Sequence, residues 1–232
     1  MKNYITIQSP IPAGFNCKRE DVNAIFGFGF HEAANQYKVV RFFDESDIYQ
    51  TRNEDYHLRV SVYTLGIDSS WRTLEEPFPY HAVHRTYLPP LVNGALHWLM
   101  FKTGCFPLEF IVSFDLKDEV FREMMSIPAH VSLQGKIEEF GGVTLPGTIG
   151  ELGGLLCFYN YTLYRDSHQS VQIWVTKEYN AVWERQYIIF TTNIIDGCGF
   201  LIPLGFAKNG QLILEKSFSD QLMLCNRKAK LT

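Results

Sequence analysis

The stretch GFGFHEAANQYKVVRFF at residues 27–43 can be interpreted as a nucleotide-binding loop or as a β-hairpin. A dinucleotide-binding loop needs a third glycine at position 32 and a helix after it. Residue 32 is Glu32, and the segment that follows is rich in valine and aromatic residues, which favour strands. The stretch therefore predicts a hairpin, in which IFGFGF and YKVVRFF are strands and HEAANQ is the turn.

The hairpin pattern recurs along the chain. Glycine precedes an apolar run of strand length in LVNGALHWLMF (91–101), ELGGLLCFYNY (151–161) and FAKNGQLILEK (206–216). Such a glycine is typical of a turn that leads into the second strand of a hairpin. A polar loop and another strand are expected after each run, at EFIVSFDL (109–116), VQIWVTK (171–177) and QLMLCN (221–226).

The spacing of these hairpins predicts the fold class. Gly94 and Gly153 are 59 residues apart, and Gly153 and Gly210 are 57 residues apart. This period suits a four-stranded unit with long loops, as in a propeller blade. We therefore predict an all-β, propeller-like array of about four antiparallel blade units within one domain, residues 1–232. The last unit is irregular, because its closing strand is either missing or supplied from elsewhere.

The composition of the chain indicates which classes of partner and which cellular location to expect. The formal net charge of −4 gives no general attraction for nucleic acid or for an anionic membrane, so neither is expected. The five cysteines are far apart and show no spacing typical of a zinc site or a disulfide framework. The N-terminal segment lacks the apolar run of a signal peptide, and no apolar stretch is long enough to cross a bilayer. A cytoplasmic or nuclear location is the expectation.

Motifs for catalysis, cofactors and metals are missing from the sequence. It contains no nucleophile elbow, no phosphate-binding loop and no zinc-protease motif. His81, His84 and His97 lie close together in sequence, but no acidic or cysteine ligand has a spacing that would complete a metal site. Trp98 and Trp174 lie inside apolar strands and are expected in the core rather than on a carbohydrate-binding surface. We expect no cofactor and no catalytic set.

Three short motifs carry a resemblance to a known family. They are GFGF with YKVV (27–30 and 37–40), VNGALHW (92–98), and IWV with KEY (173–175 and 177–179). In this order and spacing the chain resembles the F-box-associated domain of plant F-box proteins, from about residue 22 to its end. The resemblance implies a kelch-like β-propeller that serves as the substrate-binding part of an SCF ubiquitin ligase, with catalysis performed by other subunits.

The resemblance to this family also predicts which proteins the chain binds. It implies that the chain binds target proteins for ubiquitination. An F-box, the helical module that docks a Skp1-like adaptor in this family, has no counterpart in this sequence. An adaptor is therefore expected to bind only if an F-box is supplied upstream. A second hypothesis from a different class stays open, namely a propeller enzyme that acts on carbohydrate, for which Glu109, Glu151 and Asp196 are the only candidate carboxylates, or a lectin-like module that binds glycans.

The predicted blade scheme places binding residues on loops at one face of the molecule. These loops are residues 44–57, 76–90, 102–108, 129–149, 161–169 and 216–220. Tyrosine and arginine are frequent interface anchors, and histidine accompanies them here. The candidates for protein binding are Tyr49, Arg52, Tyr56, Tyr80, His81, His84, Arg85, Tyr87, Tyr161, Tyr164, Arg165 and His168.

Overall fold

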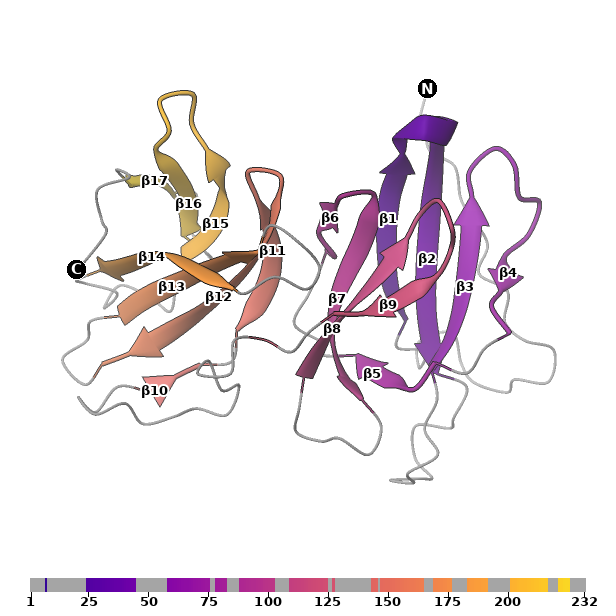
Figure 1. Cartoon of the computed structure of the whole chain (residues 1–232), viewed down its shortest axis with the longest axis horizontal. Coiled ribbons are helices and arrows are strands. Elements are labelled where there is room, and N and C mark those ends of the chain that lie inside the picture. Colours follow the sequence, from indigo (N-terminus) through magenta and orange to yellow (C-terminus); the bar gives the residue numbers. More distant parts are fainter. Residues whose placement is uncertain are drawn as a thin grey trace.

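A computed structural model shows a fold built almost entirely from antiparallel strands (Figure 1). It describes residues 7, 24–44, 58–75, 78–82, 88–102, 109–124, 127, 143–145, 147–164, 169–176, 183–191, 201–216 and 221–225. In these residues the only helical element is a short 3-10 turn, η1, at Glu32–Ala34. Among the described segments, no helix has the length and apolar character needed to span a membrane.

The first sheet contains the hairpin predicted at the opening stretch. Strand β1 pairs with β2 through the turn that holds η1, and β3 and β4 complete the sheet in chain order. Asn35 has a left-handed backbone, with φ of 53°, which lets the chain reverse after η1. The strands are β1 (Ile25–His31), β2 (Gln36–Asp44), β3 (Leu58–Thr64) and β4 (Arg72–Thr73).

The second sheet has β5, β7, β8 and β9 in order, with the short strand β6 also paired to β7. The turn between β6 and β7 is formed by Asn93 and Gly94, whose φ angles are 50° and 76°. An Asn-Gly pair with two positive φ angles is the preferred two-residue hairpin turn. The strands are β5 (Tyr80–Ala82), β6 (Leu91–Val92), β7 (Ala95–Lys102), β8 (Glu109–Asp115) and β9 (Phe121–Glu123).

The third and fourth sheets repeat this design. The third has β10, β12, β13 and β14 in order with β11 paired to β12, and the fourth has β15, β16 and β17. Gly153 and Gly154 form the turn into β12, with φ angles of 63° and 82°. The strands are β10 (Val143–Thr144), β11 (Thr148–Leu152), β12 (Leu155–Leu163), β13 (Gln169–Thr176), β14 (Glu184–Thr191), β15 (Leu201–Phe206), β16 (Leu212–Lys216) and β17 (Gln221–Cys225).

Buried side chains form three clusters, one between each pair of successive sheets. Phe42 and Trp98 belong to the cluster between the first two sheets, Leu99 and Phe158 to the next, and Leu214 to the last. The four sheets thus follow one another in chain order as blades of a four-bladed β-propeller (Figure 1). The predicted all-β array of about four blades is confirmed, and the fourth blade shows three strands in the part of the chain that the structure describes.

The two glycines of the opening stretch have a packing role. A Cβ atom at Gly27 would lie 2.5 Å from Cζ2 of Trp98, and one at Gly29 would lie 2.7 Å from Cδ1 of Leu116. Carbon atoms in contact are normally about 3.5–4.0 Å apart, so a larger residue at either position would collide with the second sheet. The GFGF pattern is therefore explained by close packing of two blades, and the nucleotide-loop interpretation is excluded.

Candidate functional site

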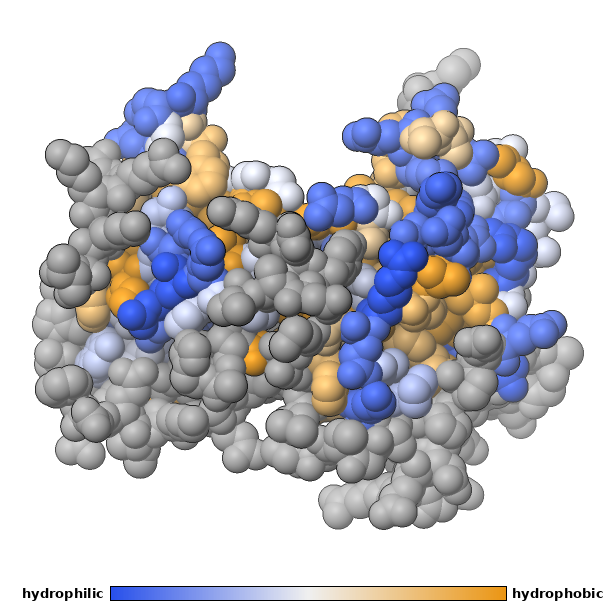
Figure 2. Space-filling view, viewed as in Figure 1, coloured by the Kyte–Doolittle hydropathy of each residue, from blue (hydrophilic) through white to orange (hydrophobic). Residues whose placement is uncertain are grey.

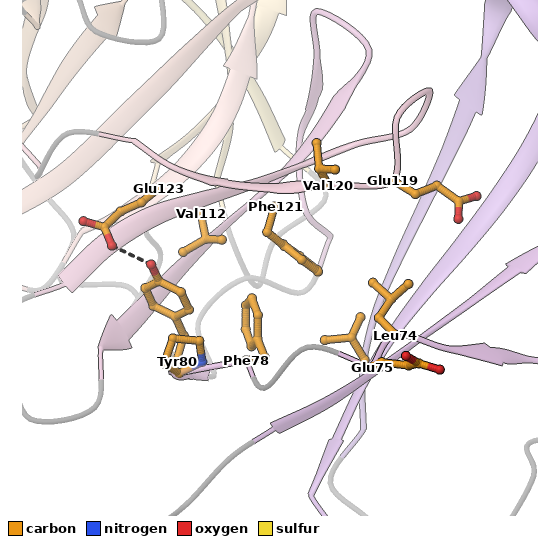
Figure 3. Close-up of a pocket in the computed structure, with 11 residues that line it drawn as sticks. Leu74, Glu75, Phe78, Tyr80, Val112, Glu119, Val120, Phe121 and Glu123 are labelled. Carbon is orange, nitrogen blue, oxygen red and sulfur yellow. Dashed lines mark hydrogen bonds between the residues drawn. The ribbon is translucent and has the colours of Figure 1, made fainter.

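A pocket of about 560 Å³ opens between the first and second sheets (Figure 3). Its volume falls in the range of cavities that bind small ligands or side chains. The lining comes from β3 and β5, from described residues between β4 and β5, and from β8, β9 and the turn between them. The lining residues are Val60, Leu74, Glu75, Phe78, Pro79, Tyr80, Val112, Glu119, Val120, Phe121 and Glu123.

Aromatic side chains form the floor of the pocket. Phe78 is buried, forms an isolated bridge with Leu58 of β3, and packs with its ring centroid 4.6 Å from that of Phe121. The Tyr80 ring lies on the other side of Phe78, at 5.0 Å between centroids. Tilted ring pairs at these distances add stability beyond the area they bury. The floor is therefore a preformed aromatic surface held by both sheets.

Glu119 is the carboxylate that connects the two sheets. It lies in the turn between β8 and β9 with a φ of 54°, in the left-handed region that a residue with a Cβ atom rarely adopts. Its oxygens accept hydrogen bonds from Lys38 Nζ of β2 at 2.7 Å, and from Nη1 and Nη2 of Arg72 in β4 at 2.7 and 2.8 Å. Paired bonds from one guanidinium are a strong, directional form of ion pairing.

The charges around Glu119 hold it ionised. The hydrogen bond from Arg72 is the largest cause, and with Lys38 it lowers the pKa of Glu119 to about 2 against the opposing effect of burial. Lys38 is buried, and its ammonium group also donates to the backbone oxygen of Leu116 at 2.6 Å. A buried ammonium needs partners of this kind, since an unpaired buried charge is strongly destabilising.

Glu123 forms the opposite end of the pocket (Figure 3). Its Oε2 atom accepts hydrogen bonds from the hydroxyl of Tyr80 and from Lys102 Nζ. Burial alone would raise the pKa of Glu123, but the bonds from Lys102 and Tyr80 outweigh burial and lower it. Both hydrogen bonds are made to Oε2, and none of the described residues donates a hydrogen bond to Oε1 of Glu123.

Glu75 completes the acidic rim, at the same end as Glu119 (Figure 3). It is exposed and follows β4 on the segment that leads into the second sheet. In the part of the chain that the structure describes, Glu75 makes no salt bridge and no side-chain hydrogen bond. Its charge is therefore not neutralised by any of these residues, unlike the charges of Glu119 and Glu123.

The structure places four of the predicted protein-binding residues. Tyr80 lies in β5 and lines the pocket, and His81 is the next residue of that strand. Tyr161 lies in β12 rather than in a loop, and its buried hydroxyl donates to the Leu201 backbone oxygen at 2.9 Å. Tyr164 follows the end of β12, with its hydroxyl 3.4 Å from Ser170 Oγ. Outside the described residues lie Tyr49, Arg52, Tyr56, His84, Arg85, Tyr87, Arg165 and His168.

Sequence reasoning missed the ion network around Glu119, although one signal was available. Lys38, Val40 and Phe42 alternate along β2 and therefore share one face of the strand. Val40 and Phe42 are fully buried, so their spacing places Lys38 on a core face where it requires a carboxylate partner. The sequence does not indicate that this partner is Glu119, which is 81 residues away.

Other residues considered from the sequence have structural roles. Trp98 and Trp174 are buried, as predicted. His97 is buried beside the Pro90 backbone oxygen, and burial lowers its pKa to about 4, so the ring is neutral at pH 7. The Glu151 carboxylate accepts a hydrogen bond from the Gly154 N–H across the turn between β11 and β12. The structure describes no group of three His, Cys, Asp or Glu side chains that could hold a metal, within the residues it covers.

Two comparisons relate the chain to known proteins. The family model described as the F-box associated beta propeller domain matches residues 1–225. A curated F-box protein of Arabidopsis thaliana is 32% identical over 209 residues, and the match covers 83% of this chain and 44% of the relative. The chain thus spans less than half the length of that relative. No solved structure matches the chain.

Proposed function

This chain belongs to the F-box associated β-propeller family, and on that premise we propose that it recognises target proteins for an SCF ubiquitin ligase. The match over residues 1–225 is the observation that carries the proposal, because it takes in all four blades. The resemblance of the Arabidopsis relative, which is described as an F-box protein, supports it.

The proposed role is binding rather than catalysis. The chain holds the target, and the other subunits of the ligase transfer ubiquitin. A Skp1-like adaptor contacts the protein through an F-box supplied upstream, and the complex acts in the cytoplasm or the nucleus. The pocket between the first two blades supports this role, since it combines a rigid aromatic floor with charged groups at its edge. Protein-binding sites typically use a buried anchor pocket of this kind.

The test measures protein turnover in plant cells. The tagged chain is captured while the proteasome is inhibited, and the proteins retained with it are identified by mass spectrometry. The half-life of each captured protein is then measured after protein synthesis is stopped, with and without the gene for this chain. We expect at least one captured protein to persist longer without the gene, and proteasome inhibition to remove that difference. If every captured protein decays at the same rate in both lines, the proposed function is wrong.

A further inference from the structure

We propose that the pocket between the first and second blades binds a basic side chain, that of lysine or arginine, presented by the target protein. This inference rests on the proposed function, because it states the chemistry of the residue that the recognition module would read. The chemistry of the pocket can be tested on the isolated chain, independently of protein degradation.

The inner surface of the pocket fits an aliphatic stem. Val60 and Val112 are buried against the aromatic floor, while Leu74 and Val120 lie nearer the opening. Val120 is 41% exposed, so an incoming group would cover apolar surface that now faces solvent. Figure 2 shows hydrophobic side chains exposed among hydrophilic ones over the first two blades. Lysine and arginine carry methylene stems that pack along such surfaces while the charged head stays at the edge.

The charged lining favours a cation. Among the described residues that line the pocket, the ionisable ones apart from Tyr80 are the carboxylates Glu75, Glu119 and Glu123. Glu119 and Glu123 are neutralised from outside the lining by Lys38, Arg72 and Lys102. Glu75 has no such partner among the described residues, and it lies at the end where Glu119 also lies (Figure 3). Arg72 also pairs with Asp68, whose Oδ1 lies 3.1 Å from Arg72 Nε. These side chains therefore carry three negative charges, on Asp68, Glu75 and Glu119, against the two positive charges of Lys38 and Arg72. The net charge of this group is negative, which attracts a cation and repels an anion.

The aromatic floor is compatible with a cation, because one of its rings already has a lysine beside it. Lys102 Nζ lies 5.7 Å from the Tyr80 ring centroid while it pairs with Glu123. A cation over an aromatic face is stabilised by the ring quadrupole, more so as water is excluded. Because Lys102 already pairs with Glu123, the incoming head group is assigned to the Glu75 end, with its stem over Phe78 and Leu74.

The experiment uses four capped single residues as probes. N-acetyl methylamides of lysine, arginine, norleucine and glutamate are titrated into the full chain. Binding is followed by NMR shifts of the Val60, Val112, Val120 and Leu74 methyl groups. Norleucine has the stem of lysine without the ammonium, so it isolates the contribution of the charge. The lysine and arginine probes distinguish an ammonium site from a guanidinium site.

We expect the lysine or arginine probe to bind about fivefold more tightly than norleucine, which corresponds to one ion pair near a protein surface. Glu75→Gln should weaken that binding about threefold, and Glu75→Lys should abolish it. Glu32→Gln removes the same charge from an exposed site that does not line the pocket, and should leave binding unchanged. Glu75 is exposed, so its variants are expected to fold, and unchanged methyl shifts in the third and fourth blades check this.

Four results would overturn the inference. Three concern the probes: norleucine binding as tightly as lysine and arginine, the glutamate probe binding more tightly than both, and no methyl shift with any probe. The fourth is an equal loss of binding affinity in Glu75→Gln and Glu32→Gln, because the effect would then come from net charge. None of these results bears on protein half-life, so failure of this inference is distinguishable from failure of the proposed function.

Discussion

Gly27→Ala tests whether close packing of the first two blades explains the glycine pattern. The added Cβ would lie 2.5 Å from Trp98 Cζ2 and 3.0 Å from Leu96 Cδ1. Trp98 is only 2% exposed, so the indole has no free space into which to move. Overpacking of this kind costs about 1–3 kcal/mol, and the lower entropy of the unfolded alanine chain offsets about 0.4–1 kcal/mol. We expect a net loss of about 1–2 kcal/mol in the free energy of unfolding.

The assay is urea unfolding of four proteins that form a double-mutant cycle. Besides the parent and Gly27→Ala, they are Trp98→Phe and the double variant. Phenylalanine lacks the outer ring atoms that the new Cβ would meet, so the cost of Gly27→Ala should fall by at least about 0.5 kcal/mol in the Trp98→Phe background. In thermal melts, Gly27→Ala should lower the melting temperature by about 2–8 °C. An unchanged stability, or an equal loss in both backgrounds, would refute the packing explanation.

Three further predictions concern other parts of the fold. Glu119→Gln should cost about 1–2 kcal/mol at pH 7 because Lys38 stays buried with a weaker partner. Folding lowers the pKa of Glu119 from 4.5 to about 2. The ionised carboxylate therefore makes its full contribution to the free energy of unfolding above pH 4.5, and this contribution is lost as the pH falls toward 2. The parent and Glu119→Gln should therefore converge in stability near pH 2, and a constant difference in urea unfolding across this range would contradict the ion network. Tyr161→Phe removes the hydroxyl that binds the Leu201 oxygen between the third and fourth blades, and should cost about 1 kcal/mol by the same method; no loss would mean that water replaces the bond. Leu222→Lys, on the exposed strand β17, should slow aggregation measured by light scattering at an unchanged melting temperature, unless this strand is covered in solution.

The strands and hairpins could be predicted because their signals are local. Valine and aromatic residues identified β2, and the glycine before the apolar run in residues 91–101 identified a hairpin turn that the structure confirms at Asn93 and Gly94. The repeat of these signals at nearly constant spacing also predicted the number of blades. Hydrophobic periodicity and positive φ angles depend on a few neighbouring residues, so a single sequence carries them in full.

The pocket could not be predicted, because it forms where distant segments meet. Tyr80 was predicted from the sequence as a binding residue. Nothing in the sequence indicated that Phe121, more than forty residues away, would also lie in the floor of the pocket. Likewise, Lys38 could be expected to need a carboxylate, but only the packing of blade against blade selects Glu119.

By itself, the sequence determined that this protein is an all-β array of about four antiparallel units and that it resembles the F-box-associated domains. Only the tertiary structure decided that Gly27 accommodates Trp98, that Glu119 joins two blades, and that Glu75 remains unpaired among the described residues. The physical reason is that strand formation follows from the pattern along the chain. Contacts between sheets depend instead on the angle and distance at which the blades pack. That packing is determined jointly by the shapes of side chains that are far apart in the sequence.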